Sequence, residues 1–146
     1  MRAQYNLVAF LFLLTIAVVI VGGVFWMFTN FRSSAAQNAG ALLLENSLSK
    51  IEQGILELKY MSENSETRNI SLTVQVPSRI SNQNYQIAGL GNSSPGFIEA
   101  RVIGSPSIVK QKNITFWNAP VFGAVQPDNG EVMLVYLPTE NKIVLK

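Results

Sequence analysis

The sequence contains no cysteine and no histidine among its 146 residues. Without cysteine, neither a disulfide framework nor a thiolate metal site can form. Without histidine, the commonest general base, the usual zinc ligand and any Ser-His-Asp arrangement are excluded. The nine acidic residues are scattered along the chain and form no cluster suited to acid–base work. We therefore expect no enzyme activity, no bound metal and no cofactor.

Charge is also scarce, at 14% of residues against roughly 25% in soluble domains. The net charge of +2 comes from Arg2 and Arg32, because basic and acidic residues balance after Arg32. A nucleic-acid binder needs a basic stripe that pairs with phosphates, and the sequence has none. We expect no nucleic-acid partner and no small-molecule ligand.

One long apolar run is present instead. From Leu7 to Phe28 the only polar side chain is Thr15, and as a helix these residues would rise about 33 Å, the thickness of a bilayer core. A secretory signal has an apolar region of roughly 7–15 residues and small residues at its cleavage site, whereas this run is longer and ends in bulky aromatic residues. Trp26 and Phe31 beside Arg32 are typical of an interfacial anchor. The pattern predicts a retained membrane helix.

A second helical pattern follows between Ala35 and Tyr60, where there is no proline. Its apolar residues recur at alternating spacings of three and four, which places them on one face of a helix. We call this set the stalk seam: Ala41, Leu44, Leu48, Ile51, Ile55 and Leu58. Three more leucines, Leu42, Leu43 and Leu56, would widen the stripe, which favours packing on a sheet over pairing with one partner helix. An interhelical seam within a filament is the alternative.

The two patterns together predict one continuous helix from about Asn6 to Tyr60, with Gly22-Gly23 and Gly40 as the candidate interruptions. The glycine pair has two interpretations. It either bends the helix or allows close approach of a second helix, or it reflects only the ordinary frequency of glycine in membrane helices.

The rest of the chain is typical of a β domain. The segment 70–76 alternates apolar and polar residues and predicts a half-buried strand. Turn sequences at 127–130 and 138–141 would join the last three strands into a meander. The further predicted strands are Tyr85–Ala88, Phe97–Ile103, Ser107–Lys110, Ile114–Trp117, Val121–Val125, Glu131–Leu137 and Lys142–Leu145. The sequence therefore predicts an α+β fold, a long N-terminal helix packed on a C-terminal antiparallel sheet.

The residues before the apolar run carry a family resemblance. Arg2-Ala3-Gln4 places a cation, a small residue and a glutamine directly before the span, which resembles the class III signal of archaeal type IV pilin-like proteins. The resemblance implies cleavage between Ala3 and Gln4 by a signal peptidase on the cytoplasmic side, while the apolar helix stays with the mature protein. The long helix, apolar and then amphipathic, is also similar to the pilin shape. One position departs: these families commonly carry a glutamate at the fifth mature position, and here that residue is Val8.

The expected domains are a leader (1–3), a membrane and assembly helix (4–32), an amphipathic stalk (33–61) and an extracytoplasmic β domain (62–146). The resemblance implies a structural subunit of an extracellular filament, with other copies or related pilin subunits as partners. The departure at Val8 favours a minor or accessory subunit over a major one. The expected assembly face of the helix is Leu7, Phe10, Leu14, Val18 and Val21. The alternative is a permanent single-pass anchor whose β domain binds a surface-layer or motility-machine partner. A more distant one is a ligand-binding face built from aromatic residues, namely Tyr85, Phe97, Phe116, Trp117, Phe122 and Tyr136.

Three N-x-S/T triplets begin at Asn69, Asn92 and Asn113, all outside the apolar run. They are candidate N-glycosylation sites if the domain is exposed outside the cell, and otherwise ordinary surface asparagines.

Overall fold

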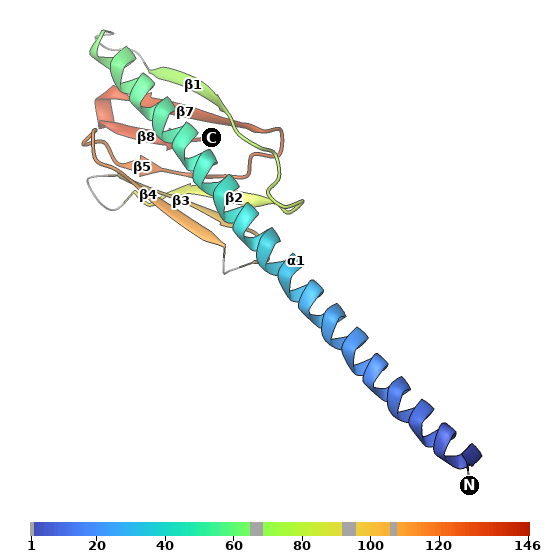
Figure 1. The fold of residues 1–146 in the computed structure, drawn as a ribbon. Helices are drawn as coiled ribbons and strands as arrows, with labels where there is room; N and C mark the ends of the chain where they lie inside the picture. The colour runs from blue at the N-terminus through green and yellow to red at the C-terminus, as the bar shows by residue number, and fades with distance from the viewer. Residues whose placement is uncertain (1, 65–68, 92–95, 106–107) are drawn as a thin grey trace. The chain divides into compact units, whose positions relative to one another are not determined.

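The computed structural model describes residues 2–64, 69–91, 96–105 and 108–146, with side chains from Asn6 onward. It divides into two units, Met1–Ala36 and Gln37–Lys146. A single α-helix, α1 (Arg2–Glu63), forms the described part of the first unit and the first element of the second (Figure 1). The predicted continuity of the helix is confirmed, since neither Gly22-Gly23 nor Gly40 interrupts it.

The second unit adds two four-stranded sheets to the helix, in the orders β1-β7-β8-β5 and β4-β3-β2-β6. All pairs are antiparallel except β5 with β8. The predicted α+β class is therefore confirmed. The strands are β1 (Ile70–Gln75), β2 (Tyr85–Gly89), β3 (Gly96–Val102), β4 (Val109–Ile114), β5 (Val121–Phe122), β6 (Ala124–Val125), β7 (Glu131–Leu137) and β8 (Lys142–Leu145), with a one-turn 3-10 helix, η1 (Pro138–Glu140), before the last.

Strand β4 corrects the sequence-based prediction of two strands in this region. The segments Ser107–Lys110 and Ile114–Trp117 were expected, but one strand, Val109–Ile114, lies between their centres, and a turn follows it at 115–116. Residue 107 lies outside the described residues. The middle of β4, residues 111–113, is polar and gives no strand signal of its own. It is a strand because it pairs with β3, while Lys110 and Lys112 form ion pairs with acids of α1, and local propensity does not register such tertiary contacts.

The predicted strand Val121–Val125 is also wrong, because Gly123 divides it into β5 and β6. Gly123 has φ +95°, and a Cβ there would lie 2.6 Å from the carbonyl oxygen of Leu145. The two short strands join different sheets: β6 pairs with β2, and β5 pairs in parallel with β8. The expected three-strand meander is therefore reduced to the β7–β8 hairpin.

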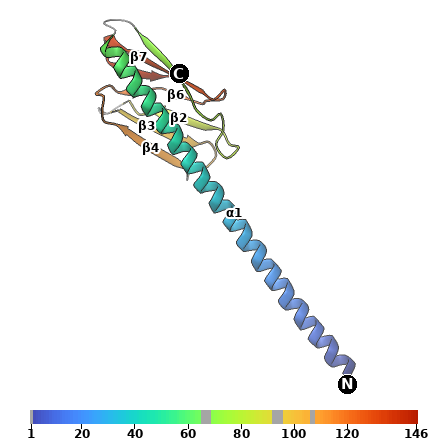
Figure 2. The same cartoon turned by 45° about the horizontal axis from the view of Figure 1, so that its top comes forward.

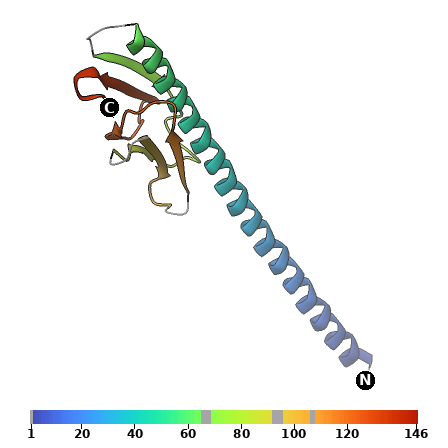
Figure 3. The same ribbon diagram turned by 90° about the vertical axis from the view of Figure 1, so that its left-hand side faces the viewer.

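The core lies between the 37–63 segment of α1 and the two sheets. This segment passes in front of the strands in Figure 2, and both sheets lie on one side of it in Figure 3. The leucines and isoleucines of the stalk seam are at most 1% exposed, and Ala41 is half-buried. Packing of the seam within its own domain is thus confirmed. The expected widening of the stripe is wrong, because Leu42, Leu43 and Leu56 remain 64%, 37% and 52% exposed.

Contacts on both flanks hold this segment in place. On one flank Gly54 allows close approach: a Cβ there would lie 2.5 Å from Val74 Cγ2 of β1 and 2.9 Å from Leu134 Cδ1 of β7. On the other flank Lys112 of β4 reaches Glu52 at 2.6 Å, and Lys59 donates a hydrogen bond of 3.0 Å to the carbonyl of Phe116.

Candidate assembly surface

The first unit presents an apolar surface that nothing in its own unit covers. Every side chain described between residues 6 and 36 is exposed, and the large apolar ones are 41% to 73% exposed, from Ile16 to Phe31. A helix that is apolar on all sides is normally buried in protein or lipid. From Asn6 onward, α1 is long and apolar enough to cross a membrane.

The two threonine hydroxyls in this stretch are satisfied within the helix. Thr15 Oγ1 donates to the carbonyl of Leu11 at 2.9 Å, and Thr29 Oγ1 donates to that of Trp26 at 2.8 Å. In hydrocarbon, where water cannot compensate, such internal bonds remove the cost of an unpaired hydroxyl. The same pairing makes the surface compatible with burial among other helices.

The five residues of the expected assembly face all lie on this exposed stretch, at spacings of three and four. Their exposures run from 51% for Leu14 to 68% for Val21. Val18 and Val21 also line a shallow apolar groove with Ala17, Gly22 and Phe25. A Cβ at Gly22 or Gly23 would meet nothing within 4 Å, so no contact within the chain requires glycine there.

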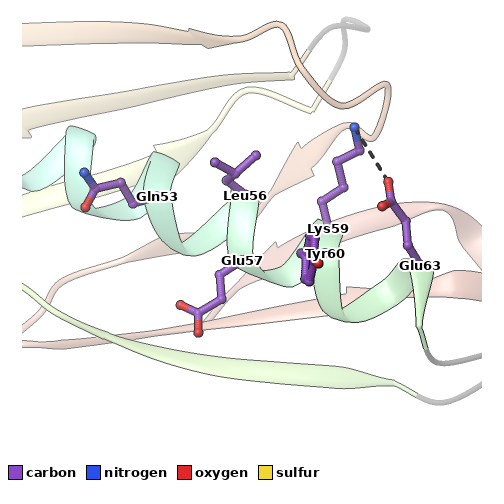
Figure 4. A pocket seen from close by; sticks show the side chains of 6 residues that line it. All are labelled: Gln53, Leu56, Glu57, Lys59, Tyr60 and Glu63. Atoms are coloured by element: carbon purple, nitrogen blue, oxygen red, sulfur yellow. Dashed lines mark ion pairs between the residues drawn. The ribbon is translucent and has the colours of Figure 1, made fainter.

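A second groove, not predicted from the sequence, lies on the outer side of the stalk near the end of α1 (Figure 4). Leu56 and Tyr60 are 52% and 72% exposed, and they lie four residues apart on the side opposite the stalk seam. Its lining is Gln53, Leu56, Glu57, Lys59, Tyr60 and Glu63, with Lys59 Nζ 3.8 Å from Glu63 Oε1. The signal available in the sequence was the four-residue spacing of two apolar side chains outside the seam.

The remaining predicted site residues are dispersed. Ala3 and Gln4 fall in the first turn of α1, and their side chains lie outside the described residues, as does the whole of Asn92. Asn69, directly before β1, and Asn113, on β4, are both exposed.

The aromatic residues do not share one face. Tyr85 is 1% exposed, and its hydroxyl donates to the carbonyl of Pro77 at 2.6 Å. Burial raises the pKa of Tyr85, and a hydrogen bond with Ser47 partly offsets that rise. Tyr136 is 9% exposed and contacts Trp117 at 4.6 Å between ring centroids, whereas Phe122 is exposed on β5. Two of the six residues of the proposed ligand face are therefore core residues.

Among the described residues, no three acidic side chains lie close enough together to hold a metal ion. The chain matches no family model, and neither a curated protein nor a solved structure is detectably similar to it.

Proposed function

We propose that this protein is a structural subunit of an extracellular type IV pilus-like filament, assembled through the apolar half of α1. The observation that carries the proposal is the contrast within one helix: the stalk seam is buried in its own domain, while the large apolar side chains of residues 7–31 are exposed. At about 25 cal/mol per Å2, covering such a surface is worth tens of kcal/mol. Lipid can cover it first, and neighbouring helices can cover it afterwards.

The assembly mechanism follows from packing. Cleavage between Ala3 and Gln4 frees the amino terminus, the helix leaves the bilayer, and its apolar surface joins a bundle of identical or related helices. The β domains then coat the outside of the filament. Satisfied hydroxyls at Thr15 and Thr29 favour this role, because neither group loses a partner when the helix moves from lipid to protein.

A second function is favoured by one residue. Val8 occupies the position at which the pilin-like families that this chain resembles commonly carry glutamate, and it is 66% exposed. A subunit without that acid suits a minor place in a filament, or a permanent membrane anchor whose β domain binds a surface-layer or motility-machine partner.

The two functions differ in the amino terminus of the protein taken from cells. In surface filaments removed by shearing, we expect the intact mass of the protein to be that of a chain that begins at Gln4. An intact Met1, found only in the membrane fraction, would reject the filament and support the permanent anchor.

A matched pair of variants tests the assembly face itself. Gly22→Phe fills the groove beside Val18 and Val21, whereas Gly23→Phe adds the same ring about 100° further around the helix. Both substitutions are apolar, and a Cβ at either position meets no atom within 4 Å, so both proteins should enter the membrane normally. We expect Gly22→Phe to reduce the yield of filaments more than Gly23→Phe. The reverse order would move the assembly face to the other side of the helix.

A further inference from the structure

In the sheet β1-β7-β8-β5, the edge strand β1 is long and uncharged, and no described strand pairs with its outer edge. Natural sheets blunt their edges with short strands, charged residues or proline. β5 and β6 are only two residues long, and the edge strand β4 carries Lys110 and Lys112, both paired with acids of α1. The remaining edge, β1, is six residues long and has neither charge nor proline.

The backbone of β1 has groups that point away from the sheet. Val76 N donates to Gly130 O at 2.9 Å, so alternate residues from Ile70 to Val74 bond to β7. The N–H and C=O groups of Ser71, Thr73 and Gln75 point outward, and they have no backbone partner in the described part of the chain. We propose that this edge pairs antiparallel with β1 of a second copy, about a twofold axis at Thr73.

The proposed register suits both faces of the strand. Thr73 would pair with Thr73 of the second copy, and Ser71 with its Gln75, each pair exchanging two backbone hydrogen bonds. On the core face, Leu72 would lie opposite Val74 of the second copy. Both are only half-buried in the single chain, so the pairing covers apolar surface as well as backbone.

In the same arrangement, the 37–63 segment of α1 is complementary to the same segment of the second copy. A Cβ at Gly54 would lie 2.5 Å from Val74 and 3.5 Å from Leu72, which places Gly54 over the middle of β1. Because α1 lies over β1 and β7, the two 37–63 segments would run antiparallel about 10 Å apart, a normal helix packing distance. Lys50, four residues before Gly54, and Glu57, three residues after it, would then meet Glu57 and Lys50 of the second copy.

The side chains on this flank are available for the contact. Leu43, Lys50 and Glu57 lie seven residues apart, each four residues before a residue of the line Ser47, Gly54 and Met61, whose middle residue lies against Val74 and Leu72 of β1. Lys50 and Glu57 are exposed and have no ion-pair or hydrogen-bond partner among the described residues. Leu43 and Met61 are each 37% exposed and would add apolar contacts at the two ends.

The absence of cysteine allows a direct test on the full chain in detergent. Antiparallel hydrogen-bonded partners have Cα atoms about 5.5 Å apart, within the roughly 4.4–6.8 Å range of disulfides. Thr73→Cys should therefore form a covalent dimer under mild oxidation. Met133→Cys is the matched control: Met133 neighbours Thr73 on β7 and is 43% exposed, but its two copies would lie about 14 Å apart and should stay monomeric. Equal dimer yields, or none from Thr73→Cys, would overturn the proposal.

A charge swap tests the helix contact. In the Thr73→Cys background, Lys50→Glu and Glu57→Lys should each lower the dimer yield roughly three- to tenfold, because each places like charges together twice. The double variant restores both pairs and should restore the yield. Failure of the double variant to do so would contradict the antiparallel helix contact.

One consequence alone rests on the proposed function. Copies within one filament run in the same direction, so this antiparallel contact would join two filaments of opposite direction. The dimerisation test in detergent does not depend on filament formation, and each can fail without the other.

Discussion

The two halves of α1 show what the distribution of apolar residues decides. Ile20 and Ile55 are the same residue type on one helix, yet Ile20 is 58% exposed and Ile55 is fully buried. In the second half the apolar residues of the seam follow one stripe, and the chain's own sheets cover it. In the first half they occur on all sides, which a single sheet layer cannot cover. A surface of this kind is normally buried in lipid or protein.

The largest expected effect tests the difference between the two halves of α1 directly. Ile55→Ala should lower the free energy of unfolding of the β domain by about 2–5 kcal/mol, because it leaves a cavity in the core. Ile20→Ala should change it by less than about 0.5 kcal/mol. Urea unfolding of the full chain in detergent, followed by the fluorescence of Trp117 in a Trp26→Phe background, measures both. Equal losses would contradict the division of roles between the halves.

The glycines of the two halves should respond in opposite ways. Gly54→Ala places a methyl group against Val74 and Leu134, and we expect a loss of about 1–3 kcal/mol despite the better helix propensity of alanine. Gly22→Ala meets no atom, so the domain should unfold at the same urea concentration as the parent. A gain in stability from Gly54→Ala would show that α1 lies further from β1 than described.

A buried and an exposed tyrosine allow the same comparison of buried with exposed side chains within the second unit. Tyr85→Phe removes the donor to Pro77 and should cost about 1–2 kcal/mol near pH 8. Because burial raises the pKa of Tyr85 above its unfolded value of about 10, its contribution is fully present below that pH and is lost as pH rises through the folded pKa. The difference in unfolding free energy between the parent and Tyr85→Phe should therefore narrow as the pH rises above about 10. Tyr60→Phe, at a side chain that is 72% exposed, is the control and should cost less than about 0.5 kcal/mol.

The smallest effect concerns the ion pairs that hold the flank of the stalk. Lys112 contacts Glu52 at 2.6 Å and Ser49 Oγ at 3.0 Å, but both charged side chains are about a third exposed. Lys112→Ala should therefore cost no more than about 1 kcal/mol, and less at high salt. Lys50→Ala, at a lysine of α1 with no ion-pair partner among the described residues, should cost nothing measurable in the monomer. A double-mutant cycle with Glu52→Ala isolates the pair.

The sequence was informative wherever the signal was local. The stalk seam, β1, β7 and β8 were predicted because period 3.6 or period 2 reports which face is buried. The surface of the first unit was predictable for the same reason, because an apolar run with one polar residue forms a helix without a polar face for water.

What could not be predicted depends on contacts between distant segments. β4 is a strand because it pairs with β3 and its lysines meet acids of α1, and β5 separates from β6 because Gly123 passes close to Leu145. The exposure of Leu42, Leu43 and Leu56 depends on how deeply the helix sits on two sheets, which a one-dimensional stripe does not specify. The free edge of β1 is apparent only once the neighbouring strands are known, and the sequence signal for the groove near Tyr60 is limited to the four-residue spacing of Leu56 and Tyr60.

The most direct test is protection of the apolar half in surface material sheared from cells, where no bilayer is present. In the cysteine-free chain, Val18→Cys and Thr139→Cys can each be treated with a water-soluble maleimide. The thiol of the Val18→Cys variant should remain unlabelled in native filaments and react after denaturation, while that of the Thr139→Cys variant, at an exposed residue of η1, reacts at once. Equal labelling of the two variants in the native material would contradict the claim that other copies of this chain cover the first half of α1.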